Sequence, residues 1–194
     1  IISESKLRHK SRGDSKDRDI YKNGYTMCLN QVEQPKTRTR VMKYQPKNIS
    51  ELSFFVGAIR PSFQSMLDIF LNRQDFSYGI EAFDNLLRTE ELPQSFLIMQ
   101  EQLMLVLKYA GFEISETYQL MKSIAKKKQG VVEKIKERFV NGFSNIAKCE
   151  IEKTLSVWKI LEDSSAYLFN ASHSLSVALD SLYGAYLKAY CPLE

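Results

Sequence analysis

The chain has 194 residues, of which 44% are hydrophobic and 26% charged, and its formal net charge is +4. This length and apolar content suit one domain or a large subdomain, and they exclude a disordered or fibrous chain. The three cysteines lie far apart without a CxxC spacing, and no stretch approaches the roughly 20 apolar residues that span a bilayer. We therefore expect a cytoplasmic protein with no zinc site and no membrane span. Because the first residue is Ile, we also expect a piece of a longer polypeptide.

The positive charge is concentrated near the beginning of the chain. Residues 1–44 contain 11 Lys or Arg against 5 Asp or Glu, a local net charge of +6, which leaves −2 for the remaining 150 residues. Residues 1–19 have few apolar side chains and are predicted to form a flexible basic arm or linker, followed by one helical region over residues 20–194. Such an arm is compatible with nucleic-acid contact and equally with a solvated tail.

The first extended or helical elements follow this arm. Residues 20–32 have a mixed pattern, with a turn at Asn23-Gly24 and an extended piece predicted over residues 25–29. A helix is predicted to begin at Asn48, which can cap it with Glu51 at the reciprocal position, and to end before Pro61. Further helices are predicted over residues 63–72, 80–88, 95–110, 115–128, 131–146, 150–162 and 174–190. The fold class is therefore mainly α, an irregular multi-helix bundle.

The last three predicted helices are amphipathic, and apolar side chains at helical spacing predict which face enters the core. The predicted core positions are Val131, Ile135, Phe139, Phe143 and Ile146; Ile151, Leu155, Trp158 and Leu161; and Leu175, Ala178, Leu179, Leu182, Tyr186 and Leu187. Between the earlier helices, the polar triplet Gln100-Glu101-Gln102 interrupts an apolar stretch. These residues either face solvent or organise a polar site, and the pattern leaves both open.

A polar cluster opens the last helix. Asn170, Ser172 and His173 lie where backbone N–H groups of a helix start are unpaired and partly positive. One interpretation is a simple N-cap, since Ser and Asn are common capping residues. The other is a seat for a phosphate or carboxylate.

Basic residues form two further candidate sites. Lys122 and Lys126 are four residues apart on one predicted helix, so both project from one face and suit an anion between them, while Lys127 and Lys128 extend the positive charge. Arg60 stands before Pro61, where a rigid turn would hold a guanidinium suited to phosphate. The alternatives are a helix end that complements its dipole and an ordinary surface arginine. The motifs GxxxxGK[ST], GxGxxG, HExxH and GxSxG do not occur in the sequence.

Several ordered blocks resemble the fingers region of the bacterial C-family replicative DNA polymerases, the DNA polymerase III α subunits. Residues 26–33 are similar to a block ending in Phe-Gln-Leu-Glu, and Gln45-Pro46 to Arg60-Pro61 resembles a helix ending in Arg-Pro-Gly. Residues 100–104 resemble Tyr-Gln-Glu-Gln-Val-Met, and residues 122–128 occupy the place of Arg-Arg-Ala-Met-Gly-Lys-Lys-Lys. Residues 167–174 resemble Tyr-Gly-Phe-Asn-Lys-Ser-His-Ser, and residues 185–192 resemble Leu-Lys-Ala-His-Tyr-Pro. The order and spacing hold from about residue 20 to the end.

The resemblance implies a DNA-directed DNA polymerase whose fingers bind the incoming dNTP and template–primer DNA. The residues implied in triphosphate binding are Arg60, Lys122, Lys126, Asn170, Ser172 and His173, and those implied in DNA binding are Arg38, Arg40, Lys127 and Lys128. The catalytic Mg²⁺ ions would be held by palm carboxylates outside this chain, which therefore contains no catalytic residue of its own. The other partners implied are the remaining polymerase domains and, through regions not present here, a sliding clamp.

The sequence departs from the family pattern at one glycine and at positions where the family has positively charged residues. Ser62 replaces the glycine after Arg-Pro, Met121 and Lys122 replace the Arg-Arg pair, and Ala171 replaces a lysine. These changes leave open an alternative function, a non-catalytic helical module that binds nucleic acid or protein and derives from such a polymerase.

Overall fold

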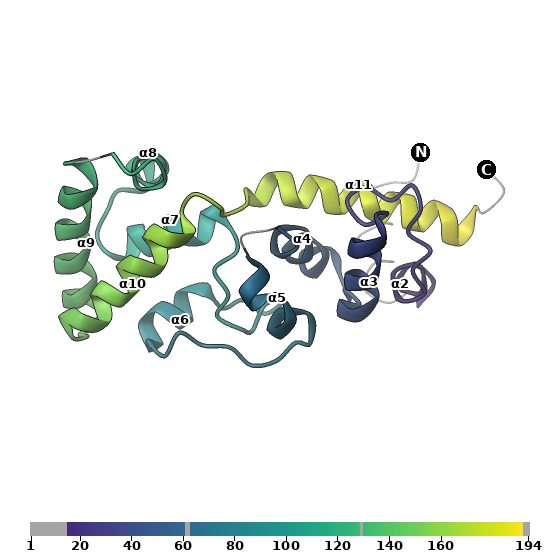
Figure 1. Ribbon diagram of the computed structural model, residues 1–194, viewed down its shortest axis with the longest axis horizontal. Helices are drawn as coiled ribbons and strands as arrows, with labels where there is room; N and C mark the ends of the chain where they lie inside the picture. The colour runs from purple at the N-terminus through teal and green to yellow at the C-terminus, as the bar shows by residue number, and fades with distance from the viewer. Residues whose placement is uncertain (1–14, 61–62, 129, 192–194) are drawn as a thin grey trace. The chain divides into compact units, whose positions relative to one another are not determined.

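The computed structural model describes residues 15–60, 63–128 and 130–191, and its regular structure is helical (Figure 1). The described helices are α2 (Ser15–Lys22), α3 (Pro35–Tyr44), α4 (Ile49–Ala58), α5 (Gln64–Leu71), α6 (Glu81–Leu87), α7 (Gln100–Tyr109), α8 (Ile114–Ala125), α9 (Val131–Ala147), α10 (Ile151–Ser164) and α11 (Ala171–Tyr190). Within these residues the only β pairing is an isolated parallel bridge between Met99 and Phe169. The predicted mainly α fold is confirmed.

The helices form two compact units. Unit 1 contains α2 to α5 together with α11, and unit 2 spans Phe76–Asn170 and contains α6 to α10. Unit 1 therefore joins segments from the two ends of the sequence. The predicted region 20–194 includes both units. Residues 15–19 of the predicted arm begin α2, and residues 1–14 lie outside the described residues.

The structure corrects two local predictions and adds one helix that was not predicted. Residues 35–44 form α3, whose apolar pattern is weak. Residues 25–29 form consecutive turns instead of an extended piece, closed by bonds such as Leu29 N–H to the Thr26 carbonyl at 3.0 Å. Residues 95–99 lie outside α7, because Phe169 donates its N–H to the Ile98 carbonyl at 3.0 Å and accepts from Gln100 at 2.9 Å. These bonds join residues about 70 positions apart, which local periodicity does not report.

Small side chains of α11 form its packed face in unit 1. Helix α11 lies against α4 and α2, and its buried residues include Ser174, Ala178, Ser181 and Ala185. The predicted core residues Leu175 and Leu187 are 42% and 52% exposed, so their assignment is wrong. Small residues let two helix backbones approach closely, and the Ser174 hydroxyl uses this proximity to donate to the Ser53 carbonyl of α4.

The core of unit 2 is aromatic and aliphatic. Its fully buried side chains include Phe83, Leu103, Phe139, Phe143 and Trp158. The buried stripes of α9 and α10 lie beside the predicted ones: Val132 replaces Val131, and Val157 and Thr154 replace Leu155 and Ile151. Val131, Ile146, Ile151 and Leu155 are exposed, which corrects their predicted core positions.

Gly142 permits a close approach of α9 to the end of α7. A Cβ built at this position would lie 1.9 Å from the Ala110 carbonyl oxygen, well inside van der Waals contact. Because that neighbour is backbone, a side-chain rotation does not relieve the clash. Any residue other than glycine at position 142 would push the two helices apart.

Gln102 is a structural residue of unit 2. Its side chain is buried, its carbonyl accepts from the N–H groups of Ile98 and Met99 at 2.8 and 2.9 Å, and its amide donates to the carbonyls of Leu87 and Phe96 at 3.1 and 3.0 Å. All donor and acceptor positions that this amide offers toward the core are therefore used. Of the two alternatives for the polar triplet, Gln102 organises a buried polar network, while Gln100 and Glu101 are half-buried.

Asp84 fixes the start of α6. Its carboxylate is 2% exposed and accepts from Ser77 Oγ at 2.6 Å, Tyr78 N–H at 2.8 Å and Ile80 N–H at 3.2 Å. Burial raises the pKa of Asp84, but these hydrogen bonds outweigh it and leave the pKa below its ordinary value of 3.8. Asp84 is therefore ionised at neutral pH and stabilises the fold in that form.

We expect Asp84→Asn to lower the stability of unit 2 by about 2 kcal/mol at pH 7, because an amide nitrogen does not accept the N–H and O–H bonds that a carboxylate oxygen accepts. A depressed pKa contributes stability above the ordinary value of 3.8, and that contribution is lost as the pH falls through the lower pKa of the folded state. Urea unfolding followed by Trp158 fluorescence at pH 7 and pH 3 measures both effects, since Trp158 is the single tryptophan. The exposed Asp163→Asn is the control, and an equal cost of both variants at pH 7 would contradict the assignment.

Candidate functional site

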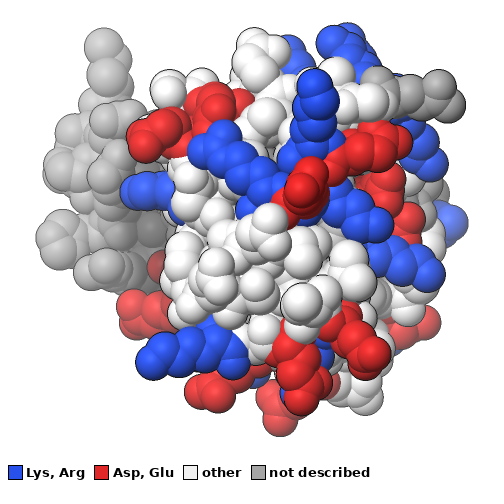
Figure 2. Space-filling model, turned by 90° about the vertical axis from the view of Figure 1, so that its left-hand side faces the viewer, with Lys and Arg blue, Asp and Glu red and all other residues white. Residues whose placement is uncertain are grey.

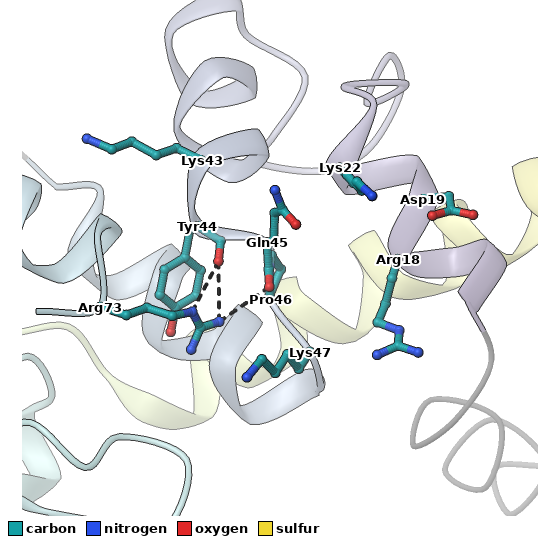
Figure 3. A pocket seen from close by; sticks show the side chains of 9 residues that line it. All are labelled: Arg18, Asp19, Lys22, Lys43, Tyr44, Gln45, Pro46, Lys47 and Arg73. Atoms are coloured by element: carbon teal, nitrogen blue, oxygen red, sulfur yellow. Dashed lines mark hydrogen bonds between the residues drawn. The ribbon is translucent and has the colours of Figure 1, made fainter.

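A basic pocket lies in unit 1 between α2, the end of α3 and Arg73, which follows α5 (Figure 3). It has a volume of about 510 Å³ and is lined by Arg18, Asp19, Lys22, Lys43, Tyr44, Gln45, Pro46, Lys47 and Arg73. Five of these side chains are cationic and one is anionic. Figure 3 shows Arg18, Lys22 and Lys47 around the loop at Gln45 and Pro46, whereas Lys43 extends away from them.

Arg73 holds the wall of this pocket in place. Its guanidinium binds both carboxylate oxygens of Glu51, at 3.1 and 2.5 Å, and donates to the carbonyls of Tyr44 and Gln45 at 3.3 Å. These carbonyls end α3 and lack partners within the helix. The guanidinium also lies 4.4 Å from the centre of the Tyr44 ring, which is stacked on Phe70 at 4.6 Å. One side chain thus joins the end of α3, the start of α4 and the end of α5.

Asn48 caps the start of α4 as predicted, but the Glu51 carboxylate binds the N–H of Lys47 instead of the N–H of Asn48. The Asn48 side chain accepts the Glu51 N–H at 2.8 Å, and the Glu51 carboxylate accepts the N–H of Lys47, the residue before the cap, at 2.8 Å. Pro61, the predicted stop of this helix, and Ser62 lie outside the described residues. The cap orients the carboxylate toward Arg73 and fixes the backbone of Lys47.

The electrostatics of this wall favour a fixed cation. Burial lowers the pKa of Arg73, but the hydrogen bond and charge of Glu51, together with Tyr44, leave that pKa raised overall. Burial also raises the pKa of the Tyr44 phenol. Arg73 and Glu51 therefore neutralise each other, and the net positive charge of the pocket comes from the remaining cations.

The two predicted phosphate-binding lysines of unit 2 lie at the end of α8. Lys122 and Lys126 are exposed, and Lys126 donates its N–H to the Lys122 carbonyl at 3.1 Å, so the helical register continues to Lys126. Lys122 Nζ lies 4.3 Å from the centre of the Tyr118 ring. Lys127, with a φ of 48°, ends the helix, and Lys128 is exposed after it. The end of α8 thus presents several exposed ammonium groups.

Met121, which stands where the family pattern has an arginine, is buried. Its side chain is 3% exposed and belongs to the hydrophobic core of unit 2. A charged residue at this buried position would cost free energy unless it were paired. The positive charge at the end of α8 therefore begins with Lys122.

The charge on α9 is mixed. Its exposed residues include Glu133, Lys134, Lys136, Glu137 and Arg138, and Figure 2 shows Lys or Arg and Asp or Glu side chains interspersed over the face of the molecule that carries this helix. Arg138 is paired with Glu116 at 3.0 Å. The described residues of this face thus mix both signs of charge, in contrast to the lining of the basic pocket, with five cations and one carboxylate.

The remaining predicted triphosphate residues are divided between the units. Asn170 belongs to unit 2, where its amide donates to Glu101 at 3.2 Å. Arg60, Ser172 and His173 belong to unit 1, with the two latter exposed in the first turn of α11. The structure brings Lys122 and Lys126 together on one helix. For the set as a whole, triphosphate binding stays a prediction.

Of the predicted DNA-binding residues in unit 1, Arg38 is exposed on α3. Arg40 donates to the Ile59 carbonyl at 3.4 Å and to Gln64 at 2.8 Å, so it also links α3 to the end of α4 and the start of α5. Sequence reasoning did not single out Arg18, Lys22, Lys43 and Lys47. The excess of positive charge in residues 1–44 includes Arg18, Lys22 and Lys43, and it was the only sign of this site in the sequence. The fold brings these residues and Lys47 to one pocket.

Among the described residues, no group of three or more His, Cys, Asp or Glu side chains lies close enough to hold a metal ion. None of the described helices combines the length and apolar character needed to cross a membrane.

An exposed basic pocket in a helical unit is typical of a protein that binds nucleic acid. Residues 4–147 match the family described as the bacterial DNA polymerase III alpha subunit finger domain, and the chain belongs to this family. It is 31% identical over 170 residues to the DNA polymerase III subunit alpha of Ureaplasma parvum, covering 84% of this chain and 17% of that protein. The corresponding protein of Thermotoga maritima is 30% identical over 178 residues, covering 91% and 20%, and that of Campylobacter jejuni is 27% identical over 188 residues, covering 93% and 16%. The chain thus spans a fifth or less of the length of these relatives.

Proposed function

We propose that this chain is the fingers part of a DNA-directed DNA polymerase, which binds the triphosphate of the incoming dNTP and the template–primer DNA during nucleotidyl transfer. The observation that carries the proposal is the family match, which includes the α8 segment with its exposed Lys122 and Lys126. Its relatives are named as DNA polymerase III alpha subunits. The polymerase activity, the other domains and a sliding clamp belong to the proposal for the whole polypeptide.

The role of the fingers residues in this proposal is electrostatic. A phosphoryl group that is attacked spreads negative charge over its oxygens, and preorganised cations that meet this charge lower the barrier. Lys122 and Lys126 would neutralise the triphosphate and orient its leaving pyrophosphate, with Arg60, Asn170, Ser172 and His173 as further contacts. The Mg²⁺ ions would be held by palm residues outside this chain.

In the polymerase that carries this chain, we expect Lys126→Ala to lower kcat/KM for the nucleotide by roughly 10-fold to 100-fold, the loss of one charge-assisted contact. DNA affinity is expected to stay nearly unchanged, because the residue contacts the nucleotide. Steady-state incorporation kinetics and DNA binding, measured on the same preparations, test both statements. His173→Ala is expected to show a smaller kinetic loss.

Lys159→Ala is the matched control, since Lys159 is exposed on α10 of the same unit. Nucleotide kinetics that are unchanged in Lys126→Ala, or changed equally in both variants, would overturn the assignment of Lys126. For His173→Ala, a lower melting temperature with normal kinetics would favour the capping role.

The alternative function is a non-catalytic helical module that binds nucleic acid or protein. It is favoured by two departures from the family pattern, the burial of Met121 in the core and the absence of a cation at Ala171. The reading frame upstream distinguishes the two functions. An aspartate-rich palm sequence in the same polypeptide supports the polymerase, and its absence from a complete gene supports the module.

A further inference from the structure

Among the residues that the structure describes, the basic pocket of unit 1 has more cations than carboxylates to neutralise them. Arg73 is matched by Glu51, and Lys43 lies 3.5 Å from Asp68. Within the described part of the chain, Arg18, Lys22 and Lys47 form no ion pair, and Asp19 is the sole carboxylate among the lining residues. Three cations without a described ion pair that line one pocket repel each other and favour an anionic ligand.

We propose that this pocket binds the phosphodiester backbone of single-stranded DNA. The inference rests on the proposed function, which supplies DNA as the polyanion, and it adds a site made of unit 1 residues, whereas Lys122 and Lys126 belong to unit 2. Arg18 and Lys22 project from α2, and Lys47 follows α3, so phosphates would be contacted from two sides. The Arg73–Glu51 pair keeps the loop that carries Lys47 in position.

The chemistry of the lining favours phosphates over bases. Single-stranded DNA that is held through its bases stacks on exposed aromatic rings. Tyr44 is the only aromatic lining residue, it is 3% exposed, and Arg73 covers its ring. The polar side chains that remain are the cations, the Asp19 carboxylate and the Gln45 amide, so the pocket reads the backbone without selecting a base sequence.

The concave form of the site favours a single strand over a duplex. A cavity of about 510 Å³ accepts a flexible backbone that bends into it. Duplex DNA has a persistence length of about 50 nm and presents its phosphates on a convex surface. A duplex therefore brings fewer phosphates to the cations of the pocket than a single strand that bends into it.

The test compares two double variants of the 194-residue chain with equal charge loss. Lys22→Gln with Lys47→Gln removes two pocket charges, and Lys134→Gln with Lys159→Gln removes two exposed charges of unit 2. We expect the pocket variant to bind a labelled single strand of about 12 nucleotides roughly 10-fold more weakly, and the control variant less than about 2-fold more weakly. The slope of log K against the logarithm of the salt concentration is expected to become smaller in magnitude by about 1.4 in the pocket variant, because each of two lost phosphate contacts contributes about 0.7. Fluorescence anisotropy at several salt concentrations measures both quantities.

Three results with the variants overturn the site. They are equal losses in the two variants, an unchanged pocket variant, and a loss for duplex DNA as large as that for the single strand. If the wild-type chain binds DNA and the pocket variant is unchanged, the site fails while the proposed function stands. If Lys126→Ala leaves nucleotide kinetics unchanged while the pocket variant loses DNA, the nucleotide-binding role fails and the site stands. Wild-type chain that binds no DNA overturns the site and the DNA-binding role together.

Discussion

Replacing Gln102 with leucine is expected to lower the free energy of unfolding of unit 2 by about 4 kcal/mol, one of the two largest losses that we predict for a single substitution. Leucine is close in size and apolar, so the cavity term is small. The cost arises because the N–H groups of Ile98 and Met99 and the carbonyls of Leu87 and Phe96 lose their partner. Each buried polar group left without a bond costs about 1–3 kcal/mol, and partial relaxation reduces the sum. Urea unfolding followed by Trp158 fluorescence measures the loss in the unit that contains both residues.

Gln100→Leu provides the matched control for this experiment. The Gln100 side chain is half-buried and makes one described bond, from its amide to the Leu168 carbonyl at 3.1 Å. We expect it to cost about 1 kcal/mol, in line with one partly solvated hydrogen bond. If Gln102→Leu is no more destabilising than Gln100→Leu, the extended segment before α7 does not depend on the Gln102 amide.

Replacing Arg73 with methionine is expected to destabilise unit 1 by about 3 kcal/mol. The Glu51 side chain is 8% exposed, so removing its cation leaves a buried carboxylate with one backbone donor. Breaking a buried pair from one side costs about 3–5 kcal/mol, and the 32% exposure of Arg73 places this pair at the lower end. Methionine keeps an unbranched apolar side chain over the Tyr44 ring, so the loss measures the removal of the guanidinium charge and its hydrogen bonds. Far-UV circular dichroism during urea unfolding follows the helices of both units, and Trp158 fluorescence follows unit 2 in parallel, so a change seen only by circular dichroism belongs to unit 1.

Two further variants identify the cause of this loss. Asp68→Asn removes the exposed Lys43–Asp68 pair, whose side chains are 42% and 89% exposed, and is expected to cost less than about 0.5 kcal/mol. The double variant Arg73→Met with Glu51→Gln is expected to recover part of the stability, because no buried charge is left unpaired. Equal costs for Arg73→Met and Asp68→Asn, or strictly additive costs in the double variant, would refute the role of the pair.

Elements fixed by neighbouring residues were predictable from the sequence, whereas elements held by remote segments were not. The cap of α4 by Asn48, the helices after residue 48 and the end of α8 near Lys127 were predictable, because capping residues and helical periodicity act within a few positions. The ordered motifs also identified the family. Helix α3 and the segment before α7 were missed. The first has a weak apolar pattern, and the second is held by Phe169, some 70 residues away.

Burial within the helices was predicted only in part. On α9, the large residues Phe139 and Phe143 were assigned to the core correctly, since the aromatic spacing is unambiguous. On α11 the apolar residues surround much of the helix, and the face that packs on α4 is the one with small residues. Periodicity measures hydrophobicity along one helix, but the neighbouring backbone decides which face fits.

The sequence by itself determined the mainly α class, the family and the exposed lysines at the end of α8, because these depend on residue type and short spacing. Tertiary structure alone decided that Gln102 and Asp84 are structural, that Arg73 joins three helices of unit 1, and that Arg18, Lys22 and Lys47 surround one pocket. The physical reason is that hydrogen bonds and charge clusters depend on distances between segments that are remote in sequence. The residues 18 and 47 share a cavity only after the chain has folded.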